Sequence, residues 1–441
     1  METNHTIEID LETTIHNDST LLDEDRAVRR KSTELPYESL GEERKASTKP
    51  EQMETSAPVE GEERRKYDQH ECRMYIYMTA SSTFITLSFT ISTMSVYDIL
   101  YPNYLYSFYS LVAIRLGILV YPFIIYYTNG KPHGKQMVVY MTVNIAVCLY
   151  MSLVVKVFDH NNLLLFVSIL LMQNVGYSLN LTGLIRVREI IHFYNDNCIP
   201  YYFIALQSLI IVHTLIGLPL SYWEVPVDTT ITVHLLISIV VYFFGMGYQR
   251  SISRTQHYIE NSDSHNRATY TLSDYVYEFK KVSYYCIMIF INVATLGVVF
   301  PAMSNKIGPT FMKHRVWANC STMVGYFFYV LGTFAKVEFI NDDKAQLAIT
   351  ITNLFLSIGV SAVYTFRNKQ YGGKDYMWMV SLLAIIFLNY TVGYYLRYSM
   401  KQVLKITVNR CSQTVVSSSM STAYSVGTII SVIIAEMSKR L

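Results

Sequence analysis

Apolar runs of about 20 residues follow one another from Met74 to near the end of the chain, each long enough to cross the ~30 Å hydrocarbon layer of a bilayer as an α-helix. The pattern predicts about eleven transmembrane helices, at residues 74–97, 104–128, 136–158, 162–185, 198–220, 229–248, 282–303, 316–338, 344–366, 376–396 and 412–435. The sequence therefore predicts an all-α polytopic membrane protein.

The longest polar interruption, residues 249–281, divides these windows into six and five. We expect helices 1–6 in residues 73–248, a cytosolic loop in 249–281 and helices 7–11 in 282–441. Transporters built from two helical halves show this division, with a substrate site near the middle of the membrane.

The first 72 residues have a different composition. They are rich in Glu, Thr, Ser, Arg and Lys and contain almost no aromatic side chains. Such a segment buries too little apolar surface to offset its ordering entropy, so we expect a disordered acidic cytosolic tail. Two stretches in it, RRKS at 29–32 and RKAS at 44–47, resemble sites of a basophilic kinase, and the alternative for each is a solvated run of charge.

The positive charges favour a cytosolic N-terminus. Lys and Arg near helix ends stay on the cytoplasmic side of the membrane. The loops after helices 2, 4 and 6 contain such residues, and those after helices 1, 3 and 5 contain none. The N-terminus lacks a basic region followed by an apolar one, so we expect no cleaved signal peptide, and the basic side chains form no stripe for nucleic acid. We expect a multi-pass protein, most simply of the plasma membrane, with Trp223, Trp317 and Trp378 as interfacial anchors at outer helix ends.

Charged residues within the spans are scarce, and such residues mark functional sites. No Asp or Glu falls at mid-depth, which favours a transporter that is not ion-coupled, although His213 and His234 leave a protonatable route. Arg115 lies near the centre of the second span. It predicts a polar cavity or an anionic ligand, and the alternative is an arginine that snorkels to the surface.

Enzyme, metal and cofactor signatures are not found in the sequence. The six cysteines are scattered without ligand spacing, and no GxSxG, HExxH or Walker motif occurs. We therefore expect no enzyme, no cofactor and no metal site.

Neutral amides are the other polar groups in the spans. They include Gln173, Asn174, Asn180 and Asn389. An amide both donates and accepts hydrogen bonds, which suits sugar hydroxyls or nucleobase edges. The alternative is that these amides join helices to one another.

The stretch LGVVFPAMSNKI at 296–307, with Phe300-Pro301-Ala302 at its end, resembles the seventh helix of the equilibrative nucleoside transporters. The next helix of that family carries Phe-Asn-x-x-Asp-x-x-Gly-Arg. Here Phe328 is retained, Gly332 occupies the Asp position and Lys336 the Arg position. The resemblance implies a major-facilitator-like bundle, with a helix that bends at Pro301.

Two further stretches resemble the same family. NVGYSLN at 174–180 is similar to its Asn...Gly-x-x-x-Gln, whose Gln contacts the nucleoside, and NYTVGY at 389–394 is similar to its Asn-Gly-Tyr. The family's Pro-Trp-Asn in helix 1 has no counterpart. The resemblance and the span chemistry together imply substrate-binding roles for Asn180, Gly176, Asn174, Arg115 and Gln173. They imply gating or structural roles for Phe300, Pro301, Phe328, Lys336, Asn389 and Gly393.

These features predict a facilitative transporter of nucleosides or nucleobases that works by alternating access between its halves. Its partners are then a small-molecule substrate, membrane lipid and a kinase acting on the tail. Two alternatives remain open. One is a transporter of phosphorylated or other anionic metabolites that uses Arg115, and the other is a receptor-like or scaffold membrane protein that has lost transport.

Overall fold

The computed structural model describes residues 72–102, 104–128, 133–157, 162–194, 199–255, 258, 272–335, 343–367, 377–406 and 410–440. The predicted tail, most of the predicted loop after the sixth helix, and Lys336 lie outside the described residues.

The described part of the chain is helical and contains no strand. Its N-terminal half comprises the helix Cys72–Thr83, α3 (Ile85–Leu100), α4 (Tyr106–Leu116), the 3₁₀ turn η1 (Gly117–Leu119), α5 (Tyr121–Thr128), α6 (His133–Val157), α7 (Leu163–Tyr194), α8 (Ile199–Tyr222) and α9 (Val227–Ile252). Its C-terminal half comprises α11 (Leu272–Val299), α12 (Ala302–Lys306), α13 (His314–Phe334), α14 (Asp343–Arg367), α15 (Met377–Ile406) and α16 (Arg410–Arg440). Each predicted apolar window coincides with one helix or with a broken helix.

Six of the described helices are long and apolar enough to span a membrane, and a seventh is added if the bent pair Cys72–Thr83 and α3 counts as one span. Shorter apolar segments of α8 and α16, at Gln207–Tyr222 and Ser425–Met437, lie beside them. Large apolar side chains on several of these helices are exposed, among them Leu164, Phe243, Phe355 and Leu383. Exposed apolar surface of this extent is what lipid-facing helices present. The chain is therefore a multi-pass bundle with an apolar exterior.

Besides the 3₁₀ turn η1 between α4 and α5, two breaks interrupt the described spans, and both lie in the interior. The first is at Phe84, where the axes of the flanking helices differ by 53°. The second is at Phe300 and Pro301, where α11 ends at Val299 and α12 begins at Ala302. The break predicted from Pro301 is present because proline supplies no backbone donor to continue the helix.

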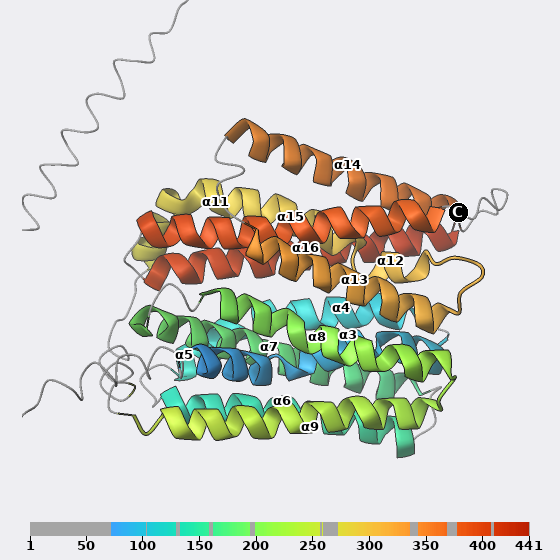
Figure 1. The fold of residues 1–441 in the computed structure, drawn as a ribbon, viewed down its shortest axis with the longest axis horizontal. Helices are drawn as coiled ribbons and strands as arrows, with labels where there is room; N and C mark the ends of the chain where they lie inside the picture. Colours follow the sequence, from blue (N-terminus) through green and yellow to red (C-terminus); the bar gives the residue numbers. More distant parts are fainter. Residues whose placement is uncertain are drawn as a thin grey trace, which may run out of the picture. The chain divides into compact units, whose positions relative to one another are not determined.

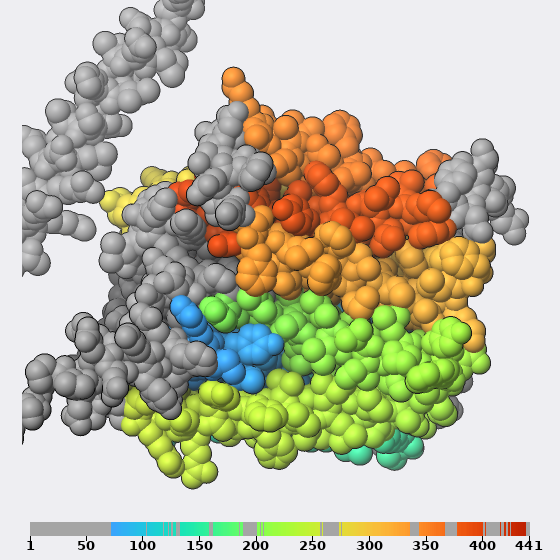
Figure 2. Space-filling model, viewed as in Figure 1, coloured from blue at the N-terminus to red at the C-terminus, as the bar shows by residue number. Residues whose placement is uncertain are grey.

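Two helix pairs make the most extensive contacts between the two halves. The helix α8 packs against α13, and α4 packs against α16 (Figure 1). On the face shown in Figure 2, the blue to yellow-green N-terminal helices and the orange to red C-terminal helices form two separate layers. Within the N-terminal half, α3 contacts α4, α6, α7, α8 and α9, so this helix is the central element of that half.

Candidate functional site

Asn180 is fully buried on α7, and in the described part of the chain neither polar atom of its side-chain amide has a hydrogen-bond partner. Nearly all buried polar groups in proteins are hydrogen-bonded, because an unpaired one loses its interactions with water without replacement. An amide left with both a free donor and a free acceptor therefore points to a ligand that supplies the missing partners.

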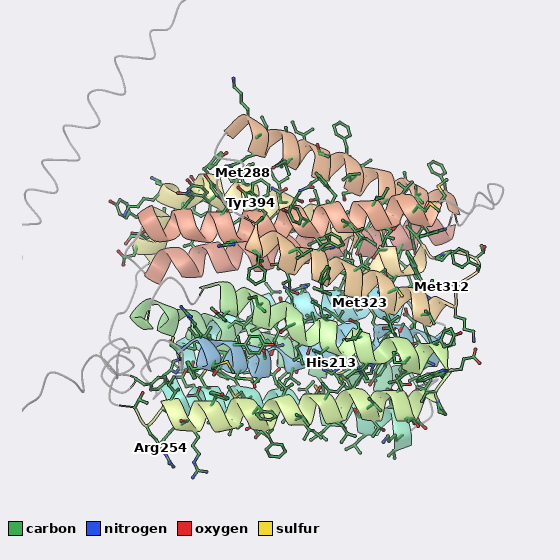
Figure 3. The ribbon with its side chains drawn as sticks, viewed as in Figure 1. His213, Arg254, Met288, Met312, Met323 and Tyr394 are labelled. Atoms are coloured by element: carbon green, nitrogen blue, oxygen red, sulfur yellow. The ribbon has the colours of Figure 1, made fainter. Side chains whose placement is uncertain are left out.

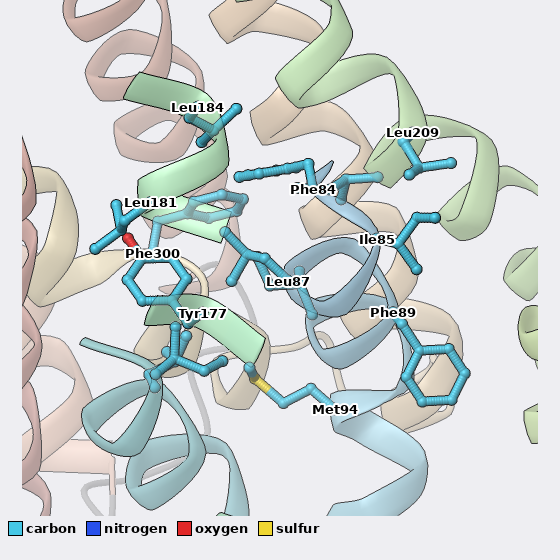
Figure 4. Close-up of a cluster of buried hydrophobic side chains, with 14 of the residues drawn as sticks. Phe84, Ile85, Leu87, Phe89, Met94, Tyr177, Leu181, Leu184, Leu209 and Phe300 are labelled. Carbon is cyan, nitrogen blue, oxygen red and sulfur yellow. The ribbon is translucent and has the colours of Figure 1, made fainter. Parts of the chain in front are cut away.

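Apolar and aromatic side chains surround this position. Tyr177 lies one turn before Asn180 on α7, and Leu181 lies one turn after Tyr177, because residues three and four apart are neighbours on a helix surface. Figure 4 shows both side chains in one buried cluster with Leu87 of α3 and with Phe300. The cluster thus brings α7 and α3 of the N-terminal half together with the break between α11 and α12 of the C-terminal half.

A second incompletely bonded amide lies beyond Phe300. A Cβ atom placed on Gly325 of α13 would lie 2.5 Å from Phe300 Cζ and 3.1 Å from Asn389 Nδ2, so both side chains pack on this glycine. Asn389 Nδ2 donates to Ile385 O (2.9 Å), while Asn389 Oδ1 has no partner. The ring of Tyr326 meets Phe300 edge-on, with centroids 5.1 Å apart. The C-terminal half therefore contributes aromatic rings and a free acceptor.

A buried hydroxyl of α3 completes the polar set. Thr90 is fully buried, and its Oγ1 has no hydrogen-bond partner. It lies between Leu87 and Met94 at helical spacing, and both of these belong to the cluster of Figure 4. We define the central site as Thr90, Tyr177, Asn180, Phe300 and Asn389.

Arg115 borders the central site. Its Nη1 donates to Tyr177 Oη, and its guanidinium carbon lies 5.0 Å from the centroid of that ring. Ser425 of α16 donates to Arg115 O (3.2 Å), so this residue lies where the two halves touch. The guanidinium thereby holds Tyr177, one turn from Asn180.

Gln173 and Asn174 form hydrogen bonds within the bundle. Gln173 Nε2 donates to Tyr106 Oη (2.6 Å), and Ser110 donates to Gln173 Oε1 (2.9 Å). Asn174 Nδ2 donates to Ala113 O (2.7 Å). These contacts join α7 to α4, which is the helix-joining role that amides also play in membranes.

Gly176 is a point of close helix packing. A Cβ atom there would lie 2.7 Å from Thr86 Cγ2, so only glycine permits this approach of α7 to α3. The residue positions Asn180 through the backbone.

Asn292 and Asn353 join helices of the C-terminal half. Asn353 Nδ2 donates to Asn292 Oδ1 (2.6 Å), Asn292 Nδ2 donates to Thr350 Oγ1 (3.1 Å), and Thr391 Oγ1 donates to Asn353 Oδ1 (3.1 Å). These bonds connect α11, α14 and α15 and leave the central site to Asn389.

The predicted gating residues on α13 and α15 lie in a close contact between these helices. A Cβ atom on Gly393 would lie 2.2 Å from Tyr329 O, and one on Gly332 would lie 2.1 Å from Tyr390 O. Gly332 occupies the position where the resembling family carries Asp, and the approach of α15 leaves no space for that side chain. Arg397 donates instead to the carbonyls of Thr333 and Ala335 at the end of α13. Phe328 packs edge-on against Phe327.

Ionic and polar contacts join the two halves at the end of the bundle that contains the α8–α9 turn. Lys306 of α12 forms a salt bridge of 2.6 Å with Asp98 of α3, and Ser107 also donates to that carboxylate. Lys313 forms a salt bridge of 2.6 Å with Glu224. No local pattern in the sequence identifies these pairs, because the partners are distant from each other along the chain.

Arg315 and Asn319 of α13 extend this contact. Arg315 donates to Thr230 Oγ1 (3.1 Å) and Val225 O (3.4 Å), and Asn319 Nδ2 donates to Ser221 Oγ (2.8 Å). We call the contact of Lys313, Arg315 and Asn319 with the α8–α9 turn the latch.

Trp317 differs from the interfacial anchor expected. It is buried, and its indole N–H donates to Ser304 O (3.0 Å). Trp223, by contrast, is 72% exposed. Trp317 therefore fixes α12 against α13.

Among the described residues, no group of three or more His, Cys, Asp or Glu side chains could hold a metal ion.

The fold is shared with solved transporter structures. A crystal structure of the nucleoside transporter NupG overlaps with 83% of this chain and 91% of its own, at a TM-score of 0.53 and 10% sequence identity. A crystal structure of an aspartate-to-alanine variant of NupG covers the same shares at a TM-score of 0.52 and 11% identity. The Fucose:proton symporter FucP of E. coli gives a TM-score of 0.43, too low to support an argument.

No protein-family model and no curated protein matches the sequence. The protein thus has the two-halved, major-facilitator-like bundle of a polytopic membrane protein.

Proposed function

We propose that this protein is a facilitative transporter of nucleosides or nucleobases that binds its substrate at the central site. The observation that carries the proposal is the fully buried amide of Asn180, which lacks both hydrogen-bond partners. A group with a donor beside an acceptor, as nucleobase edges have, satisfies both atoms of such an amide.

The apolar part of the site suits the same class of ligand. Tyr177 and Phe300 are aromatic, and an aromatic side chain offers a stacking surface to any nucleobase. Asn389 Oδ1 in the other half adds an acceptor for an amino or hydroxyl group. A flat ligand with a polar rim therefore suits a site that combines these aromatic rings with two incompletely bonded amides.

The arrangement of the halves supports alternating access. The central site draws Asn180 from one half and Phe300 and Asn389 from the other, so a ligand bound there contacts both. The latch and the Asp98–Lys306 salt bridge hold the halves together at the α8–α9 end. Breaking these contacts would open the site toward that end, which is the extracellular end if the N-terminus is cytosolic. The structural likeness to a nucleoside transporter agrees with this reading.

The experiment that tests the function is uptake of labelled adenosine, uridine and hypoxanthine by nucleoside-uptake-deficient cells that express the protein, with and without an imposed pH gradient. We expect saturable uptake that runs only down the substrate gradient. This uptake should be lost in Asn180→Ala at equal surface expression. No uptake of the three compounds, with the protein at the surface, would overturn the proposal.

Competition by a nucleotide tests the anionic-substrate alternative in the same cells. We expect nucleotides to compete weakly, because the Arg115 guanidinium is engaged with Tyr177. Strong competition that Arg115→Gln removes would favour the phosphorylated substrate instead.

A further inference from the structure

His213 of α8 and His234 of α9 form a buried pair that the central site does not use. Their Nδ1 atoms are 3.0 Å apart, and the rings stack with centroids 5.2 Å apart. Both side chains are buried, and His213, labelled in Figure 3, has no partner for its Nε2 atom. The two imidazole rings therefore contact each other in the interior of the N-terminal half.

The short Nδ1–Nδ1 distance limits where protons can lie. One Nδ1 must carry a hydrogen and donate it, and the other must accept it with its lone pair. In the neutral pair, the ring that donates from Nδ1 has a bare Nε2. One further proton can bind at that bare Nε2, which gives a singly charged pair with three N–H groups and no other change in bonding. Two imidazoles so arranged form a site for a single proton.

The charge of that proton would lie near the latch. Arg315 donates to Thr230, which lies one helical turn from His234 on α9. Asn319 donates to Ser221, two turns from His213 on α8. A proton on the pair thus places a positive charge one to two helical turns from the residues that Arg315 and Asn319 contact. The effective dielectric constant is low in this region, so this charge and that of Arg315 repel strongly.

We propose that the His213–His234 pair is a proton-binding site whose occupation releases the latch. The added charge repels the Arg315 guanidinium, and separation of α13 from the α8–α9 turn removes that guanidinium and admits water to the charged pair. By linkage, opening of the latch raises the affinity of the pair for a proton by the same factor by which the bound proton favours the open latch. This inference does not rest on the proposed function, because it concerns only the contact between the halves.

Other titratable groups near the latch do not supply this response. Lys313 donates a hydrogen bond to Glu224 and attracts its charge, which lowers the pKa of that carboxyl, so Glu224 stays ionised between pH 5.5 and 7.5. The elements packed against α8 and α9 supply few others. Toward the end of the bundle that contains the latch, they include Tyr97 and Asp98 on α3, Cys148 and Lys156 on α6, Lys313, His314, Arg315 and Cys320 on α13, and Asp228 at the start of α9. Of these, His314 is the other imidazole; desolvation and the nearby Lys306 charge lower its pKa, and it needs its own control.

Hydrogen exchange of the purified full chain in lipid nanodiscs tests the proposal without any substrate. Exchange of residues 221–230 is compared at pH 7.5 and 5.5, with exchange times scaled for the intrinsic effect of pH. Binding of one proton changes an equilibrium by at most about tenfold per pH unit. We expect the wild type to exchange faster at pH 5.5 by about threefold or more and by less than about a hundredfold.

The variants His213→Asn and His234→Asn retain a polar atom at the Nδ1 position but do not titrate. Each should lose the pH response, whereas His314→Asn, at an exposed position on α13, should keep it. Arg315→Gln should exchange faster already at pH 7.5 and respond less to pH, which provides a test if the histidine variants fail to fold. Three results would overturn the proposal. The wild type could show no pH response, the response could persist in both histidine variants, or it could be unchanged in Arg315→Gln.

Discussion

At the scale of single residues, three amide side chains on α7 differ in their hydrogen bonding. Gln173 and Asn174 form hydrogen bonds with α4, and Asn180, less than two turns further along, has no hydrogen-bond partner among the described residues. The sequence alone predicts that all three side chains bind substrate. Only the packing of α7 against α3 and α4 separates the structural amides from the one available to a ligand.

Replacing Asn180 with leucine should stabilise the ligand-free protein. The change removes a buried donor and a buried acceptor that have no partners, a penalty of roughly 1–3 kcal/mol for such a group. Thermal unfolding in detergent should show a raised midpoint, and the shift that adenosine or uridine produces in the wild type should disappear.

The matched control for Asn180→Leu is Asn174→Leu, six residues away on the same helix. That change breaks the 2.7 Å bond to Ala113 O, so it should lower the midpoint. A destabilising Asn180→Leu that still responds to nucleosides would show that Asn180 has a partner in the protein.

At the scale of elements, glycine contacts determine how closely α13 and α15 approach. Gly393→Ala should destabilise the protein by about 1–3 kcal/mol, because a Cβ atom would lie 2.2 Å from a backbone oxygen and the helices would have to separate. Denaturation of the purified protein, followed by the accessibility of its buried cysteines, measures the change.

Gly359→Ala on α14 is the control for this prediction. No atom lies within 4 Å of the position that its Cβ would occupy. Alanine also favours the helix over glycine by about 0.5–1 kcal/mol, so this variant should be neutral or slightly more stable. Equal effects of the two substitutions would show that the close contact of α13 and α15 does not limit stability.

The two helix breaks differ in how far sequence could predict them. Pro301 predicts the break between α11 and α12, because proline cannot continue a helix. The bend at Phe84 has neither proline nor glycine beside it. There, Thr83 Oγ1 bonds the carbonyls of Thr79 and Ala80, and the Phe84 N–H is shared between the carbonyls of Ala80 and Ser81. Hydroxyls that bond back to the helix often bend it, but most Ser and Thr residues do so without a break.

At the scale of the whole molecule, the salt bridge between Lys306 and Asp98 ties the two halves together. Lys306→Gln should weaken this contact, because the Asp98 carboxylate is largely buried and would lose its cation. We expect a loss of about 1–3 kcal/mol, below the figure for a fully buried pair because Lys306 is partly exposed. Faster hydrogen exchange in α12 and in the N-terminal end of α13 would report it.

Lys313→Gln is the comparison for Lys306→Gln. Lys313 pairs with Glu224 in solvent, with both side chains more than half exposed, so its loss should have little effect on stability. If the two lysine variants had equal effects on hydrogen exchange and stability, the Asp98–Lys306 pair would not hold the halves together more strongly than the Lys313–Glu224 pair.

The sequence by itself determined the helices and the class of fold. Apolar windows of bilayer length, the polar division after the sixth window and Pro301 are local patterns, because a chain in lipid must satisfy its backbone within each helix. The tertiary structure alone decided which polar groups are free and which are joined. The unpaired Asn180, the His213–His234 pair and the bridge from Asp98 to Lys306 each depend on distances between segments far apart in the chain, and no local pattern encodes such distances.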